Sequence, residues 1–173
     1  LAYCLVKGIG CAENKAEAFQ WYKKAAEQGH AEAQYNLADC LYNGIGCAEN
    51  KAEAFQWYKK AAEQGHTKAQ YNLAYCLVKG IGCAENKAEA FQWYKKAAEH
   101  GYTIAQYNLA YCLDKGIGCA ENKAEAFQWF RKAAEQGHAI AQINLASFLY
   151  NGIGCKKNKA EAFQWYKKAA EQG

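Results

Sequence analysis

The chain consists of one 36-residue sequence written almost five times over. The string GIGCAENKAEAFQWYKKAAEQG is intact at 8–29 and 44–65, and it returns with small changes at 80–101, 116–137 and 152–173. A fixed period of this size is typical of a solenoid, in which each repeat buries its apolar face only by stacking on its neighbours. This periodicity therefore indicates a function exerted through an extended surface rather than through a single reactive centre.

The first half of each repeat is predicted to be a helix, as residues 31–66 illustrate. It contains no Pro or Gly until Gly44, and Ala33, Leu37 and Leu41 recur at the i, i+4 and i+8 spacing of an apolar helical stripe. Gly44 is a candidate for the left-handed residue that ends such a helix. A short loop follows.

The second half of the repeat is predicted to be another helix. Asn50 followed by Glu53 fits a capping box, and the helix runs to Gly65. We expect Trp57 and Tyr58 to fill the gaps between repeats. Two helices and two tight turns in one repeat make an antiparallel helical hairpin, so the fold class is all-α.

Three stretches of the repeat, AQYNLA, YNGIGC and KAEAFQWYKKAAEQGH, resemble the Sel1-like repeat, a relative of the tetratricopeptide repeat. The resemblance covers essentially the whole chain. Departures from the residues that the family favours occur at Ala38, Leu41, Cys47, Ala48 and Asn50, and none of them is incompatible with the hairpin.

The resemblance implies an all-α, right-handed α-solenoid that forms a single domain over residues 1–173. It also implies a scaffold or adaptor function, although some bacterial members of the family are secreted and rich in cysteine. The predicted repeats are 1–30, which is truncated at its N-terminal end, 31–66, 67–102, 103–138 and 139–173.

One face of the first helices is the candidate ligand site. The positions that differ most between repeats fall, together with a recurrent tyrosine, on an arc of roughly 100° opposite the invariant leucines. Related solenoids would place this arc on the inner, concave face. Drift at exposed positions explains the variation as well, but the gathered tyrosines favour a ligand groove, because tyrosine combines rigid contact area with a polar tip. The predicted ligand-binding residues are Tyr35, Asp39, Tyr42, Asn43, Lys68, Tyr71, Tyr75, Lys79, Tyr107, Tyr111, Asp114, Lys115 and Tyr150.

We therefore predict a protein–protein interaction scaffold that binds a peptide or partner protein along this face. Two alternatives remain open: a secreted, disulfide-bridged protein that binds or hydrolyses a small molecule, and a structural or engineered repeat without a dedicated ligand. The net charge of +4 is spread in mixed sign along the helices, which argues against a nucleic-acid partner. End-to-end self-association is expected if the terminal repeats are left uncapped.

The nine cysteines allow two interpretations. Four repeats carry a pair seven residues apart, such as Cys40 and Cys47, which could form a local disulfide. The last repeat instead has Phe148 at the helix position and keeps Cys155, which favours an apolar site filled by a reduced thiol.

Neither an enzyme nor a cofactor or metal site is predicted. Ser147 is the only serine, Asp39 and Asp114 are the only aspartates, and the cysteine spacings match no zinc motif. Each histidine that follows a helix-ending glycine is expected to be a surface residue.

The compartment is not specified by the sequence. No signal peptide precedes Leu1, so a cytoplasmic protein is favoured over a secreted one. The absence of a run of 18 apolar residues argues against a membrane span. Leu1 falls within a repeat, so the chain is expected to be a fragment of a longer protein.

Overall fold

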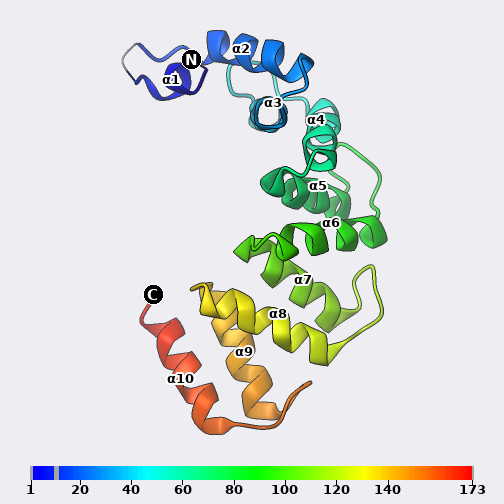
Figure 1. The fold of residues 1–173 in the computed structure, drawn as a ribbon, viewed down its shortest axis with the longest axis vertical. Helices are drawn as coiled ribbons and strands as arrows, with labels where there is room; N and C mark the ends of the chain where they lie inside the picture. Colours follow the sequence, from blue (N-terminus) through cyan, green and yellow to red (C-terminus); the bar gives the residue numbers. More distant parts are fainter. Residues whose placement is uncertain (1, 10–11, 173) are drawn as a thin grey trace. The chain divides into compact units, whose positions relative to one another are not determined.

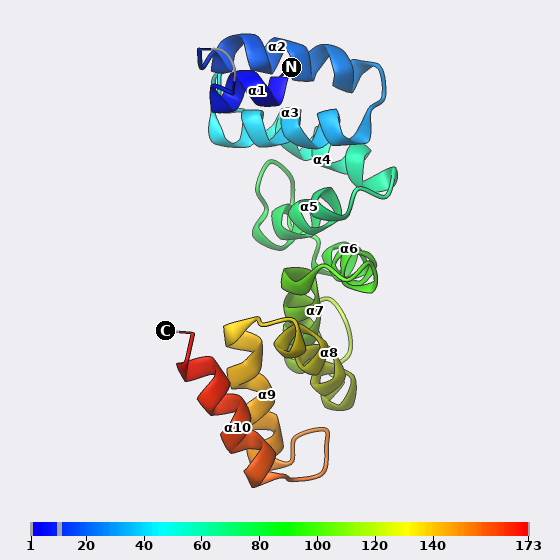
Figure 2. The same cartoon turned by 60° about the vertical axis from the view of Figure 1, so that its left-hand side comes forward.

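The computed structural model describes residues 2–9 and 12–172, which form ten α-helices in two compact units, residues 1–86 and 87–173. Consecutive helices pack against one another within each unit (Figure 1 and Figure 2), which confirms the predicted all-α fold of paired helices. The first unit contains α1 (Ala2–Lys7), α2 (Lys15–Glu27), α3 (Ala31–Asn43), α4 (Lys51–Glu63) and α5 (Thr67–Lys79). The second unit contains α6 (Lys87–Glu99), α7 (Thr103–Lys115), α8 (Lys123–Glu135), α9 (Ala139–Asn151) and α10 (Lys159–Ala170).

Local side-chain and backbone signals fix the helix ends. Asn50 Oδ1 accepts a hydrogen bond from the Glu53 N–H at 3.1 Å, which confirms the predicted N-cap of α4. In the usual capping box the glutamate side chain accepts from the backbone N–H of the N-cap residue. Here the Asn50 backbone N–H donates to the Leu41 carbonyl at 2.8 Å, so Glu53 accepts from the Asn50 side-chain amide instead. Gly44, with φ 67°, ends α3 as predicted, and its N–H donates to the Cys40 carbonyl.

A close backbone contact joins each loop to the repeat before it. Gly82 has φ 70°, and a Cβ atom at this position would lie 2.1 Å from the carbonyl oxygen of Lys51, the first residue of α4. The second unit repeats the contact between Gly118 and Lys87, where the corresponding distance is 2.0 Å. The second glycine of the loop is therefore an inter-repeat contact, which no side chain larger than hydrogen could occupy.

The core lies between the first helices and the inward faces of the second helices. Tyr58 on α4 is 2% exposed. The prediction that tryptophan also fills the gaps between repeats is wrong for Trp57, which is half-buried on α4 with its ring beside the Lys60 ammonium at 4.0 Å. The invariant leucines of the first-helix stripe are among the most buried large side chains, at 0–1% exposed: Leu37, Leu73, Leu109 and Leu145.

A buried glutamine ties the first helix α3 to the helices on either side. Gln34 is 5% exposed, and its Nε2 donates to the Ala26 carbonyl at the end of α2 at 3.2 Å. Its Oε1 accepts from Gln64 Nε2, just after α4, at 2.7 Å. These bonds satisfy a buried amide and fix the order in which helices stack.

Among the described residues, none of the helices combines the length and the apolar character needed to span a lipid bilayer. The right-handed sense of the superhelix, and a single domain running through residues 86 and 87, stay predictions.

Candidate functional site

The structure leaves parts of the predicted first-helix face accessible. Tyr75 on α5 and Tyr111 on α7 are 38% and 41% exposed, whereas Tyr35, Tyr71 and Tyr107 are half-buried. Two large aromatic rings are thus exposed to solvent at the same position of successive repeats. This arrangement is not expected of a face where any polar residue would serve.

Two of the half-buried tyrosines, Tyr35 and Tyr107, pack against the histidine that precedes the next first helix. The Tyr35 ring stacks on His66 with 4.6 Å between centroids, and Tyr107 stacks on His138 at 4.7 Å. His66 Nδ1 accepts a backbone N–H at the start of α5, and its Nε2 lies 2.9 Å from Glu32 Oε2. The expectation that these histidines are plain surface residues is therefore wrong: His66 and His138 are helix N-caps packed against the tyrosine face.

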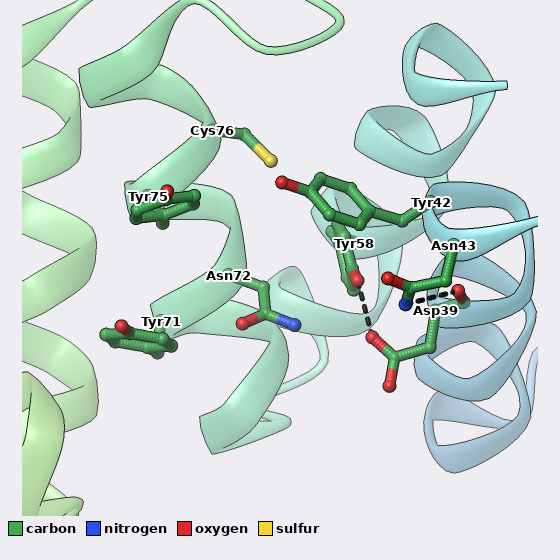
Figure 3. A pocket seen from close by; sticks show the side chains of 8 residues that line it. All are labelled: Asp39, Tyr42, Asn43, Tyr58, Tyr71, Asn72, Tyr75 and Cys76. Atoms are coloured by element: carbon green, nitrogen blue, oxygen red, sulfur yellow. Dashed lines mark hydrogen bonds between the residues drawn. The ribbon is translucent and has the colours of Figure 1, made fainter. Parts of the chain in front are cut away.

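The clearest hollow on this face is a pocket of about 260 Å³ in the first unit, which we call the Asp39 pocket. Figure 3 shows the rings of Tyr71 and Tyr75, from α5, on one side and those of Tyr42 and Tyr58 on the other. The Asn72 amide lies between the two sides (Figure 3). The lining residues are Asp39, Tyr42, Asn43, Tyr58, Tyr71, Asn72, Tyr75 and Cys76.

A hydrogen bond between two helices of one hairpin orders the floor of this pocket. The Tyr58 hydroxyl on α4 donates to Asp39 Oδ1 on α3 at 2.5 Å. Burial raises the pKa of the Tyr58 phenol, and the hydrogen bond to the Asp39 carboxylate raises it further. Asn43 Nδ2 donates to the Asp39 carbonyl at 3.0 Å, so two residues predicted for the site contact each other. Tyr58 thus stays a neutral donor that orients the carboxylate.

The corresponding place in the second unit is closed with apolar groups. Phe130 stands where Tyr58 does in the repeat, and Phe148 stands where Cys76 does. These two rings meet edge to face at 5.3 Å, and they are only 1% and 6% exposed. The Asp39 pocket is therefore a feature of particular repeats and not a general property of the hairpin.

Asp114, at the position of Tyr42 in its repeat, does not present its carboxylate to a ligand groove. It is 8% exposed, and its two oxygens pair at 2.9 Å with Lys115 and Lys123. These two lysines hold the pKa of Asp114 below its ordinary value, although burial acts in the opposite direction. Asp114 and Lys115 thus neutralise each other within the second unit.

The remaining predicted residues lie outside the Asp39 pocket. Lys79 is exposed near the end of α5. Lys68 borders a wider hollow of about 650 Å³ that also includes Tyr3 and Tyr22. Tyr150 is 47% exposed, with the Lys159 ammonium 5.1 Å from its ring.

Three pocket residues, Tyr58, Asn72 and Cys76, were not predicted from the sequence. The predicted site consisted of the positions that vary between repeats and of the recurrent tyrosine on the same arc, and these three residues belong to neither set. One signal in the sequence could have drawn attention to Tyr58. The equivalent position holds a tyrosine in the other repeats but Phe130 in one of them, which shows that the repeat can form without the hydroxyl.

The cysteines of the described residues are free thiols. The loop Cys47 Sγ lies 3.6 Å from the Cys40 carbonyl oxygen, and Cys83 and Cys76 repeat this relation at 3.7 Å. Burial raises the pKa of the Cys40 thiol to about 11 and that of Cys76 and Cys112 to about 12. Such protonated thiols are poor nucleophiles and act as small core residues. Cys11, the partner of Cys4 in the first predicted pair, lies outside the described residues.

The arrangement suits binding better than catalysis. No three histidine, cysteine, aspartate or glutamate side chains gather into a metal-binding group in residues 2–9 and 12–172. The Asp39 pocket presents a carboxylate, phenol rings and two side-chain amides, which are groups that hold a ligand by shape, charge and hydrogen bonds.

Solved structures of repeat proteins are similar to this chain. None of the curated proteins compared with the chain matches it. A Sel1 repeat protein from Oxalobacter formigenes is 41% identical with a TM-score of 0.91, and the alignment covers 99% of this chain and 68% of that one. The protective antigen c5321 of uropathogenic Escherichia coli is 35% identical with a TM-score of 0.96, and the alignment covers 99% of this chain and 37% of the antigen.

A more distant match is cysteine-rich protein B of Helicobacter pylori, which is 25% identical with a TM-score of 0.58 over 75% of this chain and 92% of that one. These structures share the solenoid of paired helices. The Sel1 repeat matches residues 1–30, 31–66, 67–102, 103–138 and 139–173. The chain therefore belongs to the Sel1 repeat family.

Proposed function

We propose that the chain binds a partner protein through an extended segment that lies along its first-helix face, with the Asp39 pocket as the anchoring point in the first unit. The observation that carries the proposal is the pocket itself. It combines four tyrosines, two side-chain amides and a carboxylate on the face where the repeats differ most. Tyrosine is enriched at interfaces because its ring buries apolar area while its hydroxyl keeps a polar partner.

Several features support an anchored rather than a diffuse contact. Binding energy concentrates in a few aromatic side chains within well-packed pockets, and the surrounding contacts serve mainly to exclude water. Tyr75 supplies an exposed ring at the rim, and Tyr58 supplies a buried one at the floor. The outward face of α4 carries instead Trp57 covered by Lys60, which is typical of a solvated surface.

A selection from a random peptide library tests the proposal even while the partner is unidentified. Peptides selected on the whole chain are titrated by fluorescence anisotropy against the wild type and two variants. The test variant combines Tyr75→Ala with Tyr42→Val, since valine occupies the latter position in two other repeats. The control variant, Trp57→Ala, removes an aromatic ring from the second-helix face of the same unit.

We expect the test variant to bind the selected peptides at least about ten-fold more weakly, which is the cost of losing one good anchor. The control variant should bind as the wild type does. Peptides that bind the test variant with unchanged affinity, or that depend on Trp57 instead, would show that the partner uses another face.

A further inference from the structure

We propose that the Asp39 pocket binds an arginine side chain of the partner protein. This inference rests on the proposed function and assigns the chemistry of its anchor. Four observations carry it: the charge of the pocket, the arrangement of its rings, its size and its counterpart in the second unit.

The pocket carries a single negative charge, and one oxygen of this carboxylate is left to accept a hydrogen bond from a ligand. Asp39 is the only lining residue with a formal charge. Its Oδ1 accepts from the Tyr58 hydroxyl, and its Oδ2 has no hydrogen-bond partner within the described residues. The ammonium of Lys51 lies 5.7 Å from the Tyr42 ring, but it is paired with Glu49 at 3.0 Å. A cationic ligand therefore meets an uncompensated carboxylate.

The rings around this carboxylate favour a cation over a neutral group. Tyr42 and Tyr58 are tilted by 56° with their centroids 6.3 Å apart. Tyr71 and Tyr75 lie on the opposite side of the pocket (Figure 3). The π-faces of such rings attract a cation, and the attraction grows as water is displaced. The chain already uses this chemistry on its surface, where the Lys60 ammonium lies 4.0 Å from the Trp57 ring.

The size and shape of the pocket select among cations. Its volume of about 260 Å³ lies just below the roughly 300–1,000 Å³ typical of small-molecule sites, so it suits one side chain. A guanidinium is planar, stacks on aromatic rings and donates several hydrogen bonds at once, whereas an ammonium is a compact, strongly hydrated point charge. With the Asp39 carboxylate on one side, rings on both sides and the Asn72 amide between them (Figure 3), arginine is the better fit.

The second unit shows what the same hairpin looks like without these features. In the hairpin of residues 103–138, Phe130 has no hydroxyl to orient a carboxylate, and Tyr111 stands at the position of Asp39. The carboxylate and its phenol donor are both absent from that repeat. Phe148 of the next repeat fills the space of the thiol. A site that binds a cation in the first unit should thus have no equivalent there.

The test is a titration of the whole chain with single amino-acid probes, followed by NMR of protein labelled with carbon-13 in its tyrosine rings. The probes are N-acetyl-arginine methylamide, its neutral isostere N-acetyl-citrulline methylamide, and N-acetyl-lysine methylamide. The signals of Tyr42 and Tyr75 are assigned through the variants Tyr42→Val and Tyr75→Phe. The proposal predicts saturable shifts of both signals with the arginine probe, at least ten-fold weaker binding of citrulline, and weaker binding of lysine.

The variant Asp39→Asn should bind the arginine probe at least ten-fold more weakly. Asp39→Ser, which copies the residue of the last repeat, guards against a folding defect of the first variant. Asp114→Asn in the second unit is the matched control and should change nothing. Equal binding of arginine and citrulline, equal or tighter binding of lysine, or full binding by both Asp39 variants would overturn the assignment. If the probes fail while selected peptides still depend on Tyr75, the proposed function stands and only the arginine assignment falls.

Discussion

The Tyr58 hydroxyl on α4 lies 2.5 Å from Asp39 Oδ1 on α3, so one hydrogen bond links the two helices of a hairpin at the floor of the pocket. A bond to a charged acceptor is stronger than one between neutral groups, and Tyr58 is almost fully buried. The same bond therefore contributes to the stability of the hairpin and orients the one carboxylate of the binding site.

Replacing this hydroxyl should destabilise the chain. Tyr58→Phe leaves the half-buried Asp39 without its donor, and we expect the free energy of unfolding to fall by roughly 1–3 kcal/mol in urea titrations at pH 7. Tyr166→Phe is the matched control, because this residue occupies the same repeat position but is 40% exposed. Equal stabilities of the two variants would contradict a structural role for the bond.

The pH dependence of this difference has a definite sign. The pKa of Tyr58 is raised above its ordinary value of 10.0. The stabilisation is therefore complete below that value and is lost as the pH rises toward the folded-state pKa. The stability gap between wild type and Tyr58→Phe should shrink above about pH 10 in urea titrations. A gap that widens with rising pH would be inconsistent with a raised pKa.

The loop glycine that touches the preceding repeat should not tolerate a side chain. Gly82→Ala introduces a Cβ atom 2.1 Å from the Lys51 carbonyl oxygen at a residue with φ 70°. We expect a loss of about 2–5 kcal/mol, from left-handed strain together with overpacking. Gly65→Ala is the control: its φ is 88°, but nothing lies within 4 Å of the added atom, so only the strain applies. In thermal unfolding, the melting temperature of Gly82→Ala should lie well below that of Gly65→Ala. The reverse order of melting temperatures would contradict the contact.

The buried thiols should react slowly with alkylating reagents. The pKa values of Cys76 and Cys112 are about 12, so the thiolate is scarce at neutral pH, and both side chains are almost inaccessible. Iodoacetamide at pH 8 should modify the loop residues Cys47 and Cys119 well before these two, as peptide mass mapping can measure. Rapid modification of Cys76 in the folded chain, or a mass gain on reduction that reveals disulfides, would contradict the free, buried thiols.

Local features of the hairpin could be predicted from sequence because their physical causes are local. Gly44 and Asn50 act through their own backbone conformation and through neighbours within four residues, so both helix ends follow from residue type and spacing. The leucine stripe follows from helical periodicity in the same way. The tyrosine face was located because the variable positions share one arc of the first helix.

Contacts between residues far apart in the sequence could not be predicted in this way. Tyr58 meets Asp39 from 19 residues away, and Gln64 meets Gln34 from 30 residues away. Nothing in a single helix indicates which buried amide or phenol finds which partner. Asp114 shows the opposite failure: its position on the variable arc suggested a ligand contact, whereas Lys123, nine residues on, folds back and pairs with it.

Site-specific photo-crosslinking tests the central claim most directly. Benzoylphenylalanine is placed at Tyr75 on the first-helix face or at Trp57 on the second-helix face, and the chain is irradiated with a peptide from the library selection. The account predicts a covalent adduct at Tyr75 that disappears when unlabelled peptide is added in excess, and none at Trp57. An adduct at Trp57 without one at Tyr75 would show that the partner lies on the opposite face and would contradict the account.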